Sequence, residues 1–240
     1  MEDARSVAVE TSASPRRPTA RERVRAEIRA EILDLAHRQM AQLGAGQISL
    51  RAIARELDMA SSAIHRYFPS RDDVITALLI REYTALGEAL QAGQAEIEPG
   101  DSAARCKAFL LSGRAWAAAN PHSFALLFGT PVPGYVAPDS TKEPASAPMR
   151  LLAELLETIS DTGGPQGPAA VDVPAAVVAP AMSALPAAPS WRVATALAAW
   201  TWMIGAIDAE LWGHYVNVVD DPDALYQATV DHWVNALGLG

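Results

Sequence analysis

The sequence contains a single cysteine, Cys106, so the chain of 240 residues can form no internal disulfide and can supply no CxxC zinc site. This excludes a small secreted scaffold held together by disulfides and points to a reducing compartment, the cytoplasm. No apolar run is long enough to span a membrane, and the N-terminal residues lack the apolar core of a signal peptide. We therefore expect a cytoplasmic protein with no membrane partner.

The motifs of common enzyme classes are also missing. The sequence has no GxSxG nucleophile elbow, no GxxxxGK[ST] phosphate loop, no HExxH metal motif and no GxGxxG dinucleotide fingerprint. The five histidines lack the spacing of metal ligands. They are His37, His65, His122, His214 and His232. We expect no catalysis, no metal site and no cofactor.

Three of the titratable side chains still need an interpretation. His37, beside Arg38, is expected on the exposed side of its helix. His122 follows the helix-breaking Pro121 and could line a pocket, although a structural histidine is the favoured interpretation. The Cys106 thiol could act as a redox sensor beside a lysine, but without a partner thiol an inert helical cysteine is favoured.

Positive charge is scarce overall but concentrated at the front of the chain. The net charge is −9, yet residues 1–81 carry 13 arginines against 11 acidic residues, while residues 82–240 carry 6 basic against 17 acidic residues. A basic run precedes the first helix. It consists of Arg16, Arg17, Arg21, Arg23 and Arg25. Such a run could be an arm that binds phosphate groups of DNA, or it could be a solvated tail.

The spacing of apolar residues predicts helices throughout. Half of the residues are apolar, and a chain of this length can bury a substantial core. Residues 1–18 are rich in Ser, Pro and Glu and are expected to be disordered. The first ninety residues then contain four predicted helices. They run from residue 24 to 43, from 50 to 59 after the capping Ser49, from 61 to 68, and from the capping Ser70 to about 91.

Two of these helices are too short to be stable alone, so the first and fourth must hold them. In the third helix Ile64 and Phe68 are the core-facing pair. Its other positions carry small residues at the start and the hydrogen-bond donors His65, Arg66 and Tyr67 at the end. A short helix that buries one edge and presents donors on the other is typical of a helix-turn-helix, whose second helix enters the major groove of DNA.

The segment ISLRAIARELDMASSAIHRYFPSRDDVITALL resembles the DNA-binding segment of the TetR family of bacterial transcriptional repressors. The family pattern is matched by Ser49, Ala54, the HRYF run at residues 65–68, and Ser70 with Arg71. The resemblance covers residues 24–83 without a gap. The chain departs from the family at several places: Asp58 replaces the usual turn glycine, Ala60 the usual cap serine, Ser61 and Ser62 the usual Lys and Gly, and His65 the usual Tyr. With Ala60 in the cap position, we expect Ser61 to cap the third helix.

The resemblance implies an all-α protein in two parts. Residues 19–69 would form the helix-turn-helix domain, and a long helix would join it to a helical ligand-binding and dimerisation domain over residues 70–240. The DNA contacts that it implies divide into two sets. Bases would be contacted by Ser61, Ser62, Ala63 and His65, and phosphates by Ser49, Arg51, Tyr67, Arg71 and Arg21. The partners implied are a palindromic DNA operator, a second copy of the chain and a small-molecule effector.

The second part is expected to contain helices over residues 101–119, 122–129, 149–159 and two more near the C-terminus, with a Pro/Gly/Ala-rich linker near 161–190. Its GTPVPGY and LWGHY segments resemble the C-terminal domain of one large TetR subgroup. Large apolar side chains there exceed what three or four packed helices strictly require, and as a set we expect them to line a ligand pocket, although for each one taken singly a place in the core is the favoured interpretation. They are Trp116, Phe124, Leu127, Phe128, Leu152, Leu155 and Met203.

Apolar stripes on the last two helices predict either a dimer interface or packing within the domain, and the dimer is favoured because a two-fold operator needs a two-fold protein. The residues concerned are Trp200, Ile207, Leu211, Leu225, Thr229 and Trp233. We expect a homodimeric repressor that a small apolar ligand releases from its operator. The alternative is an effector-free architectural DNA-binding protein. A cavity of several hundred Å³ in the second part would favour the ligand-responsive repressor, and a solid core there would favour the architectural protein.

Overall fold

The computed structural model describes residues 19–157, 170–184 and 188–239, and all regular elements in these ranges are helices. The predicted disordered tail over residues 1–18 lies outside the described residues. The same holds for residues 158–169 and 185–187, which contain much of the expected linker. No helix in the described ranges is long and apolar enough to cross a bilayer.

The first ninety residues form the four expected helices. They are α1 (Ala20–Leu43), α2 (Leu50–Glu56), α3 (Ser61–Ile64) and α4 (Arg71–Ala92), with a 3₁₀ turn, η1 (Ala45–Gln47), after α1. Complete capping boxes start the two long helices, Thr19 with Glu22 in α1 and Ser70 with Asp73 in α4. Each box satisfies backbone N–H groups that a helix start leaves without partners, which explains why both helices begin where they do.

The third helix is shorter than the sequence predicts. It ends at Ile64, and the backbone continues to Phe68 as turns closed by bonds such as Tyr67 N–H to Ile64 O at 2.9 Å. Its N-cap is Ala60, whose side chain cannot accept a hydrogen bond, and Ser61 is the first helical residue and not the cap. The expectation that Ser61 caps the helix is therefore wrong.

The second part of the chain has more helix than expected. Its long helices are α5 (Ser102–Ala119), α6 (Pro121–Phe128), α7 (Lys142–Glu157), α9 (Ser190–Leu211) and α10 (Pro222–Ala236). Helix α7 begins seven residues before the predicted Met149 and contains Pro148. Shorter elements are η2 (Asp139–Thr141), η3 (Ala175–Val177) and α8 (Ala179–Ala184), so part of the expected linker is helical. Helix α7 packs along α4, where Ala147 approaches Gly87 closely enough that an added Cβ would lie 3.5 Å from the Ala147 Cβ.

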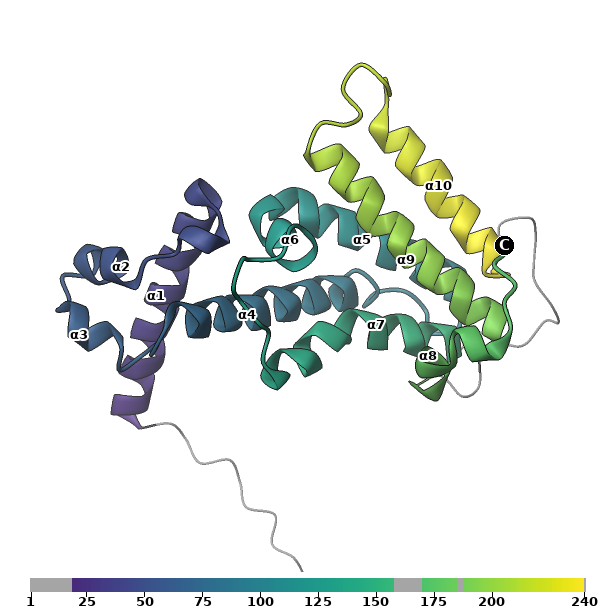
Figure 1. Cartoon of the computed structure of the whole chain (residues 1–240). Coiled ribbons are helices and arrows are strands. Elements are labelled where there is room, and N and C mark those ends of the chain that lie inside the picture. Colours follow the sequence, from purple (N-terminus) through teal and green to yellow (C-terminus); the bar gives the residue numbers. More distant parts are fainter. Residues whose placement is uncertain (1–18, 158–169, 185–187, 240) are drawn as a thin grey trace, which may run out of the picture.

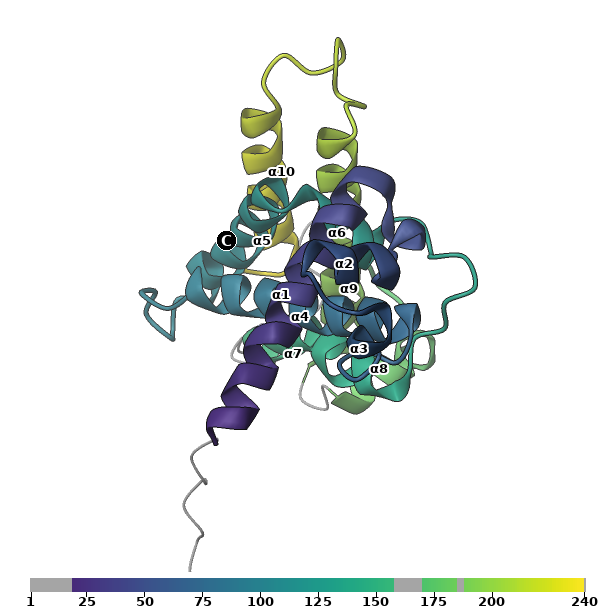
Figure 2. The same cartoon turned by 90° about the vertical axis from the view of Figure 1, so that its left-hand side faces the viewer.

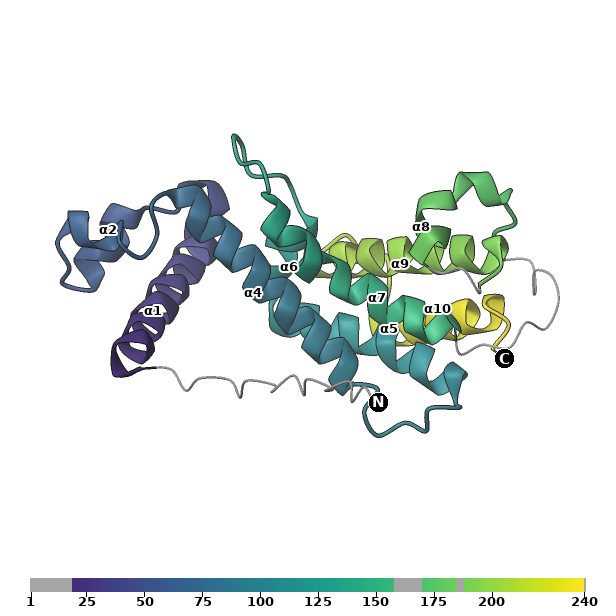
Figure 3. The same cartoon turned by 90° about the horizontal axis from the view of Figure 1, so that it is seen from below.

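The buried apolar side chains form two clusters that α4 joins. Val74, Ile75 and Leu78 at its start belong to the N-terminal cluster with α1, α2 and α3, whereas Leu86 and Leu90 belong to the cluster of the second part. Figure 1 shows the N-terminal helices on the left, α4 running from them into the larger part, and the antiparallel pair α9 and α10 on the right. The view from below shows the same bridging course of α4 (Figure 3). Helix α4 is thus the element shared by both parts.

Candidate nucleic-acid interface and domain junction

Helix α2 and the turn after it are built by local hydrogen bonds. The Ser49 hydroxyl accepts from the Ala52 N–H at 3.3 Å, which confirms Ser49 as the cap of α2. After α2 the backbone of Asp58 adopts a left-handed conformation with φ of 51°. This conformation favours glycine but is open to Asp, and it lets the Met59 N–H reach Ala54 O at 2.8 Å. The turn therefore keeps the geometry that a glycine would provide.

Helix α3 buries one edge and exposes the other. Ile64 and Phe68 are fully buried in the N-terminal cluster, as predicted. On the opposite edge Ser61, Ser62 and His65 are exposed. Figure 2 shows α2 and α3 at the front of the molecule when the N-terminal end faces the viewer. The predicted base-contacting residues thus share one accessible surface, with Ala63 half-buried beside them.

The His65 ring has a defined orientation. Its Nδ1 lies 2.9 Å from the backbone carbonyl of Pro69. A carbonyl oxygen can only accept a hydrogen bond, so Nδ1 is the atom that carries the proton. In the neutral ring Nε2 then has a free lone pair. Nε2 is therefore the ring atom that His65 presents to a base edge, as an acceptor in the neutral ring and as a donor in the charged ring.

Arginines of α1 hold the end of the α3 region. Arg25 donates to Arg66 O at 2.9 Å and lies 5.6 Å from the centre of the Tyr67 ring. Arg29 donates to Tyr67 O and lies 4.1 Å from the centre of the Phe68 ring. Arg29 was missed in the sequence analysis, although it lies one helical turn after Arg25. These contacts fix α3 against α1 and leave two guanidinium groups at the surface beside it.

A basic groove of about 440 Å³ lies between the start of α1 and the end of the α3 region. Arg21, Arg25, Arg66 and Tyr67 are among its lining residues. Of the predicted basic arm, Arg16 and Arg17 lie outside the described residues, whereas Arg21, Arg23 and Arg25 lie within α1. The expectation that these three precede the first helix is therefore wrong, because the capping box at Thr19 starts α1 four residues before the predicted residue 24. The groove brings together three positive charges and a phenol, groups that suit a phosphate.

The comparisons with known proteins agree with this geometry. Residues 32–78 match the family model of bacterial regulatory proteins of the tetR family, and residues 106–233 match the tetracyclin repressor-like C-terminal domain. The second match alone spans more than half of the chain. The protein belongs to the TetR family. It is therefore a DNA-binding transcriptional regulator and not an enzyme, because the family consists of regulators.

Individual relatives support the same assignment. The chain is 42% identical over 114 residues to an HTH-type transcriptional regulator of Mycobacterium tuberculosis, a match that covers 48% of this chain and 49% of the relative. The chain thus spans about half the length of the curated relatives it matches. It is 34% identical to the regulatory protein SCO4313, whose crystal structure superimposes with a TM-score of 0.72 over 90% of this chain and 98% of that chain. A TetR family regulator from Shewanella sp. PV-4, 17% identical, shares the fold with a TM-score of 0.58 over 86% of this chain and 95% of that chain.

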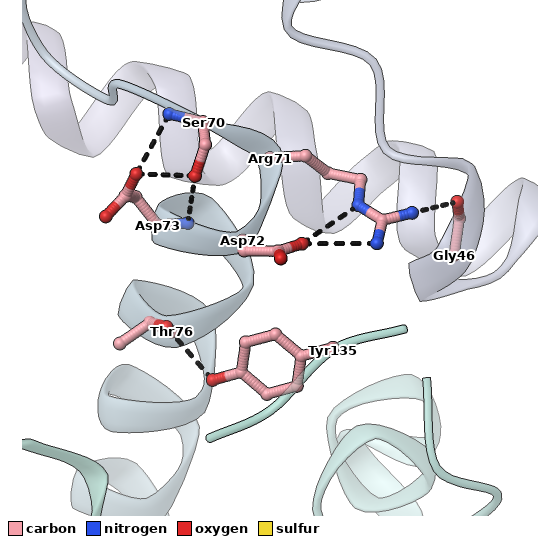
Figure 4. Close-up of polar contacts among 7 residues, drawn as sticks. All are labelled: Gly46, Ser70, Arg71, Asp72, Asp73, Thr76 and Tyr135. Carbon is pink, nitrogen blue, oxygen red and sulfur yellow. Dashed lines mark hydrogen bonds and ion pairs between the residues drawn. The ribbon is translucent and has the colours of Figure 1, made fainter. Parts of the chain in front are cut away.

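In this TetR family chain, Arg71 already has partners within the protein. Its Nε and one terminal nitrogen contact Asp72 Oδ1 at 3.2 and 3.1 Å, and the other terminal nitrogen donates to Gly46 O at 3.1 Å (Figure 4). The arginine that the resemblance assigns to phosphate binding therefore also ties the start of α4 to the turn after α1. Arg51, another of the predicted phosphate ligands, is exposed on the first turn of α2.

The segment after α6 links the second part back to the DNA-binding part. The Tyr135 hydroxyl and Thr76 Oγ1 share a hydrogen bond of 2.9 Å (Figure 4). Leu126, Val132 and Tyr135 pack against the N-terminal cluster. This contact lies between one and two turns along α4 from Arg71. The sequence analysis missed it because a proline-rich loop has no periodicity from which its packing could be predicted.

Polar side chains cross the junction between α1, α4 and α6. The His37 Nε2 atom lies 3.0 Å from the hydroxyl of Ser123, which is buried. Arg81 donates to Asp34 at 2.8 Å and to the buried Glu82 at 2.9 Å. His37 is half-buried and paired, so the expectation that it lies on the exposed side of α1 is wrong: that side of α1 meets α6, which the sequence of α1 alone could not reveal.

We expect the His37 contact to make stability depend on pH. Burial, the largest cause, lowers the pKa of His37 below its usual 6.5, because an imidazolium is poorly solvated there. The unfolded chain therefore binds this proton at a higher pH than the folded chain does. The stabilisation is fully present above pH 6.5 and is lost as the pH falls from 6.5 through the lower pKa of the folded chain. Wild type should lose more free energy of unfolding than His37→Gln between pH 7.5 and 5.5 in chemical denaturation. Parallel pH profiles for the two proteins would contradict this.

The seven residues predicted to line a ligand pocket lie in and around the second core. Trp116, Phe124, Leu152, Leu155 and Met203 are buried in it. Leu127 and Phe128 are half-buried and pack against it. None of the seven lines the cleft of about 650 Å³ at the junction of the two parts, and Leu152 borders a void of only about 20 Å³. The structure therefore brings these side chains together as a packed core. Cys106 lies in the same core, and burial raises its thiol pKa to about 12, in line with an inert cysteine.

The residues predicted for the dimer interface do not share one exposed face. Ile207 is 2% exposed and belongs to the core, and the Trp200 ring lies 6.2 Å from Phe109 and 6.0 Å from Phe128, centre to centre. Leu211, Thr229 and Trp233 are half-buried, and Leu225 is exposed. The apolar stripe of α9 thus packs on α5 within the same protomer, which removes Ile207 from a surface that a second copy could reach, whereas Trp200 is half-buried like Leu211. The stripe predicts burial but not the partner that buries it.

Proposed function

We propose that the protein is a homodimeric repressor that reads a palindromic operator with α3 and leaves it when a small molecule binds. The observation that carries the proposal is the exposed edge of α3 with Ser61, Ser62 and His65, held on its other edge by the N-terminal cluster. We assign residues 19–69 to DNA binding, with the first turns of α4 completing their core. Selection of binding sites from random DNA should enrich two half-sites whose centres lie about 34 to 36 Å apart or a multiple of that spacing. If the selection enriches no sequence, this function is refuted.

The roles within the interface can be separated by two substitutions. His65→Ala should remove a hydrogen-bonding group at one base, cost about 1 to 3 kcal/mol on the selected operator and relax the preference at one position. Arg51→Ala should weaken binding to all sequences and flatten the salt dependence by about one unit. Fluorescence anisotropy with operator and scrambled DNA over a salt series measures both. Equal losses on both DNAs for both variants would contradict the assignment.

We place the dimer interface on the outward face of α9 and α10, around Thr201, Gly205 and Leu225. All three are exposed, and a Cβ added to Gly205 would meet no atom within 4 Å. Small residues on an exposed helix face allow a second helix to approach closely. This placement keeps Leu225 from the sequence-based set, with Thr229 at its edge, and leaves out the buried Ile207.

Gly205→Glu should abolish the dimer without unfolding the protomer. Within a single protomer the Cβ of the new side chain meets no other atom within 4 Å. Because glycine has a low helix propensity, its replacement should stabilise helix α9 by up to about 1 kcal/mol. A charge between two close helices should shift most of the protein to monomer at micromolar concentration in light scattering. Gly100→Glu, the same change at another position with nothing within 4 Å, is the matched control and should stay dimeric. A dimeric Gly205→Glu protein would place the interface elsewhere.

The packed core around Trp116 and Phe124 favours a second candidate, an architectural DNA-binding protein without an effector. A cleft of about 650 Å³ at the domain junction favours the ligand-responsive repressor, because its volume suits a small organic molecule. Repeating the selection with and without compound mixtures separates the two. An operator that is bound equally with every mixture would favour the architectural protein.

A further inference from the structure

A cleft of about 650 Å³ lies where the two parts meet. Four elements form its walls: the end of α1 with η1, helix α6, the segment over residues 129–133, and the chain at the end of α9. Most of the lining is apolar, with Leu126, Val132 and two prolines. The polar lining residues that matter here are His122, Asp208, Trp212 and His214. His122 thus lines a cleft, the alternative that the sequence analysis left open for it.

The charge of the cleft comes from one carboxylate. Asp208 is half-buried, and its Oδ1 accepts from the Trp212 indole N–H at 2.9 Å. None of the lining residues is Lys or Arg, and the ion pairs found within the described residues do not include Asp208. A partly desolvated carboxylate without a neighbouring cation attracts positive charge more strongly than one in water. The Trp212 indole, 46% exposed, adds an aromatic surface that also favours a cation.

We propose that this cleft is the effector site and that it takes a small aromatic organic cation. The cation would contact the Asp208 carboxylate and the Trp212 indole, while its ring system would lie against Leu126 and the prolines of the following segment. The net charge of residues 82–240, with 17 acidic against 6 basic residues, adds a long-range attraction of the same sign. This inference rests on the proposed function, because it names the effector class of the ligand-released repressor.

Occupation of the cleft reaches the DNA interface through Gly46. This glycine lines the cleft, and its carbonyl accepts the hydrogen bond from Arg71 at the start of α4. A ligand that pushes on the turn at Gly46 therefore displaces the hydrogen-bond partner of Arg71, and Arg71 positions the start of α4 beneath α2 and α3. Since a dimer must present two α3 helices at a fixed spacing, a shift at this point favours the conformation that does not bind the operator.

The test uses a pair of probes with one ring system, 10-methylacridinium as the cation and acridine as its uncharged analogue at pH 8. Each is titrated into the full-length chain, with dye fluorescence as the readout. The cation should bind at least about tenfold more tightly than acridine, and Asp208→Asn should reduce that preference by about tenfold, the effect of one partly screened charge. Asp220→Asn removes an exposed carboxylate outside the cleft and is the matched control, with no expected change.

The effector role is tested with the selected operator. The cation should weaken operator binding by wild type, and operator should weaken cation binding by the same factor. The same titration with Asp208→Asn controls for dye that binds directly to the DNA, because that binding is the same whichever of the two proteins is present. Equal binding of the two probes, or equal losses in Asp208→Asn and Asp220→Asn, would overturn the cation site. Cation binding that leaves operator affinity unchanged would overturn the effector role. A protein that selects no operator at all would refute the proposed repressor while leaving the cation measurements valid.

Discussion

We expect Phe68→Ala to lose about 3 to 5 kcal/mol of stability in the DNA-binding part and to lose specific operator binding with it. Phe68 is 1% exposed, and the Arg29 guanidinium lies 4.1 Å from its ring centre. The truncation leaves a cavity where α1, α3 and α4 meet and removes the surface over which Arg29 lies. Because α3 has only one regular turn, it has no helical stability of its own to offset the loss. Urea denaturation followed by circular dichroism measures the loss.

The matched control for this prediction is Phe109→Ala. Phe109 is fully buried in the other core, so a similar loss should fall on the second part of the chain. Limited proteolysis should cut Phe68→Ala first within residues 19–70 and Phe109→Ala first outside that range. Identical cleavage patterns would show that the two clusters unfold as one unit and would contradict a loss confined to the DNA-binding part.

The helices of the DNA-binding part could be predicted from the sequence because each depends on local signals. Ser49 and Ser70 cap their helices as predicted, and Ile64 and Phe68 are the buried pair of the α3 region. His37 is the exception, because it is half-buried against α6, which is far away in the sequence. The error at the start of α3 is local: Ala60 occupies the cap position, and Ser61 is the first helical residue. These features are settled within about four residues along the chain, which is the range over which propensity and spacing are informative.

The candidate sites of the second part could not be predicted in the same way. Trp116 and Met203 are large and apolar whether they line a cavity or fill a core, and only the packing of α5 against α9 decides between the two. Asp208 and Trp212 are four residues apart, and their spacing indicates a helix contact but not a cleft. The cleft exists because η1 and the segment after α6, which are 80 or more residues apart in the sequence, meet across the junction. Contacts of this kind leave no periodic signal.

We expect Arg114→Met to cost about 2 to 3 kcal/mol and to weaken the dimer, because this arginine joins the three helices behind the proposed interface. From α5, it donates to Glu210 of α9 at 2.7 and 2.8 Å and pairs with Asp223 of α10 at 2.6 Å. Its guanidinium lies 4.9 Å from the ring centre of Tyr226, whose hydroxyl donates to Leu110 O at 2.9 Å. The hydrogen bond to Glu210, the largest cause, raises the pKa of Arg114 further, so the charge persists at all working pH values.

The expected size follows from burial. The Arg114 side chain is 17% exposed and Glu210 29%, so removing the arginine leaves a partly desolvated carboxylate without its partner. Asp223 is 81% exposed, and its pair should contribute less than about 1 kcal/mol. Arg114→Lys keeps the charge but not the two parallel bonds, and it should lie between wild type and Arg114→Met.

Lys107→Met is the control, because the pair of Lys107 with Asp231 also joins α5 to α10 at 2.7 Å but is 42% and 57% exposed. It should cost less than about 1 kcal/mol and leave the dimer intact. Chemical denaturation gives the stabilities, and light scattering over a dilution series gives the dimer dissociation. If the two methionine variants were equally stable, the bidentate pair would contribute no more than a surface ion pair. If Arg114→Met were destabilised but dimerised as wild type does, α9 and α10 would present the interface without support from α5, and the dimer surface would have to lie away from the Glu210 end of α9.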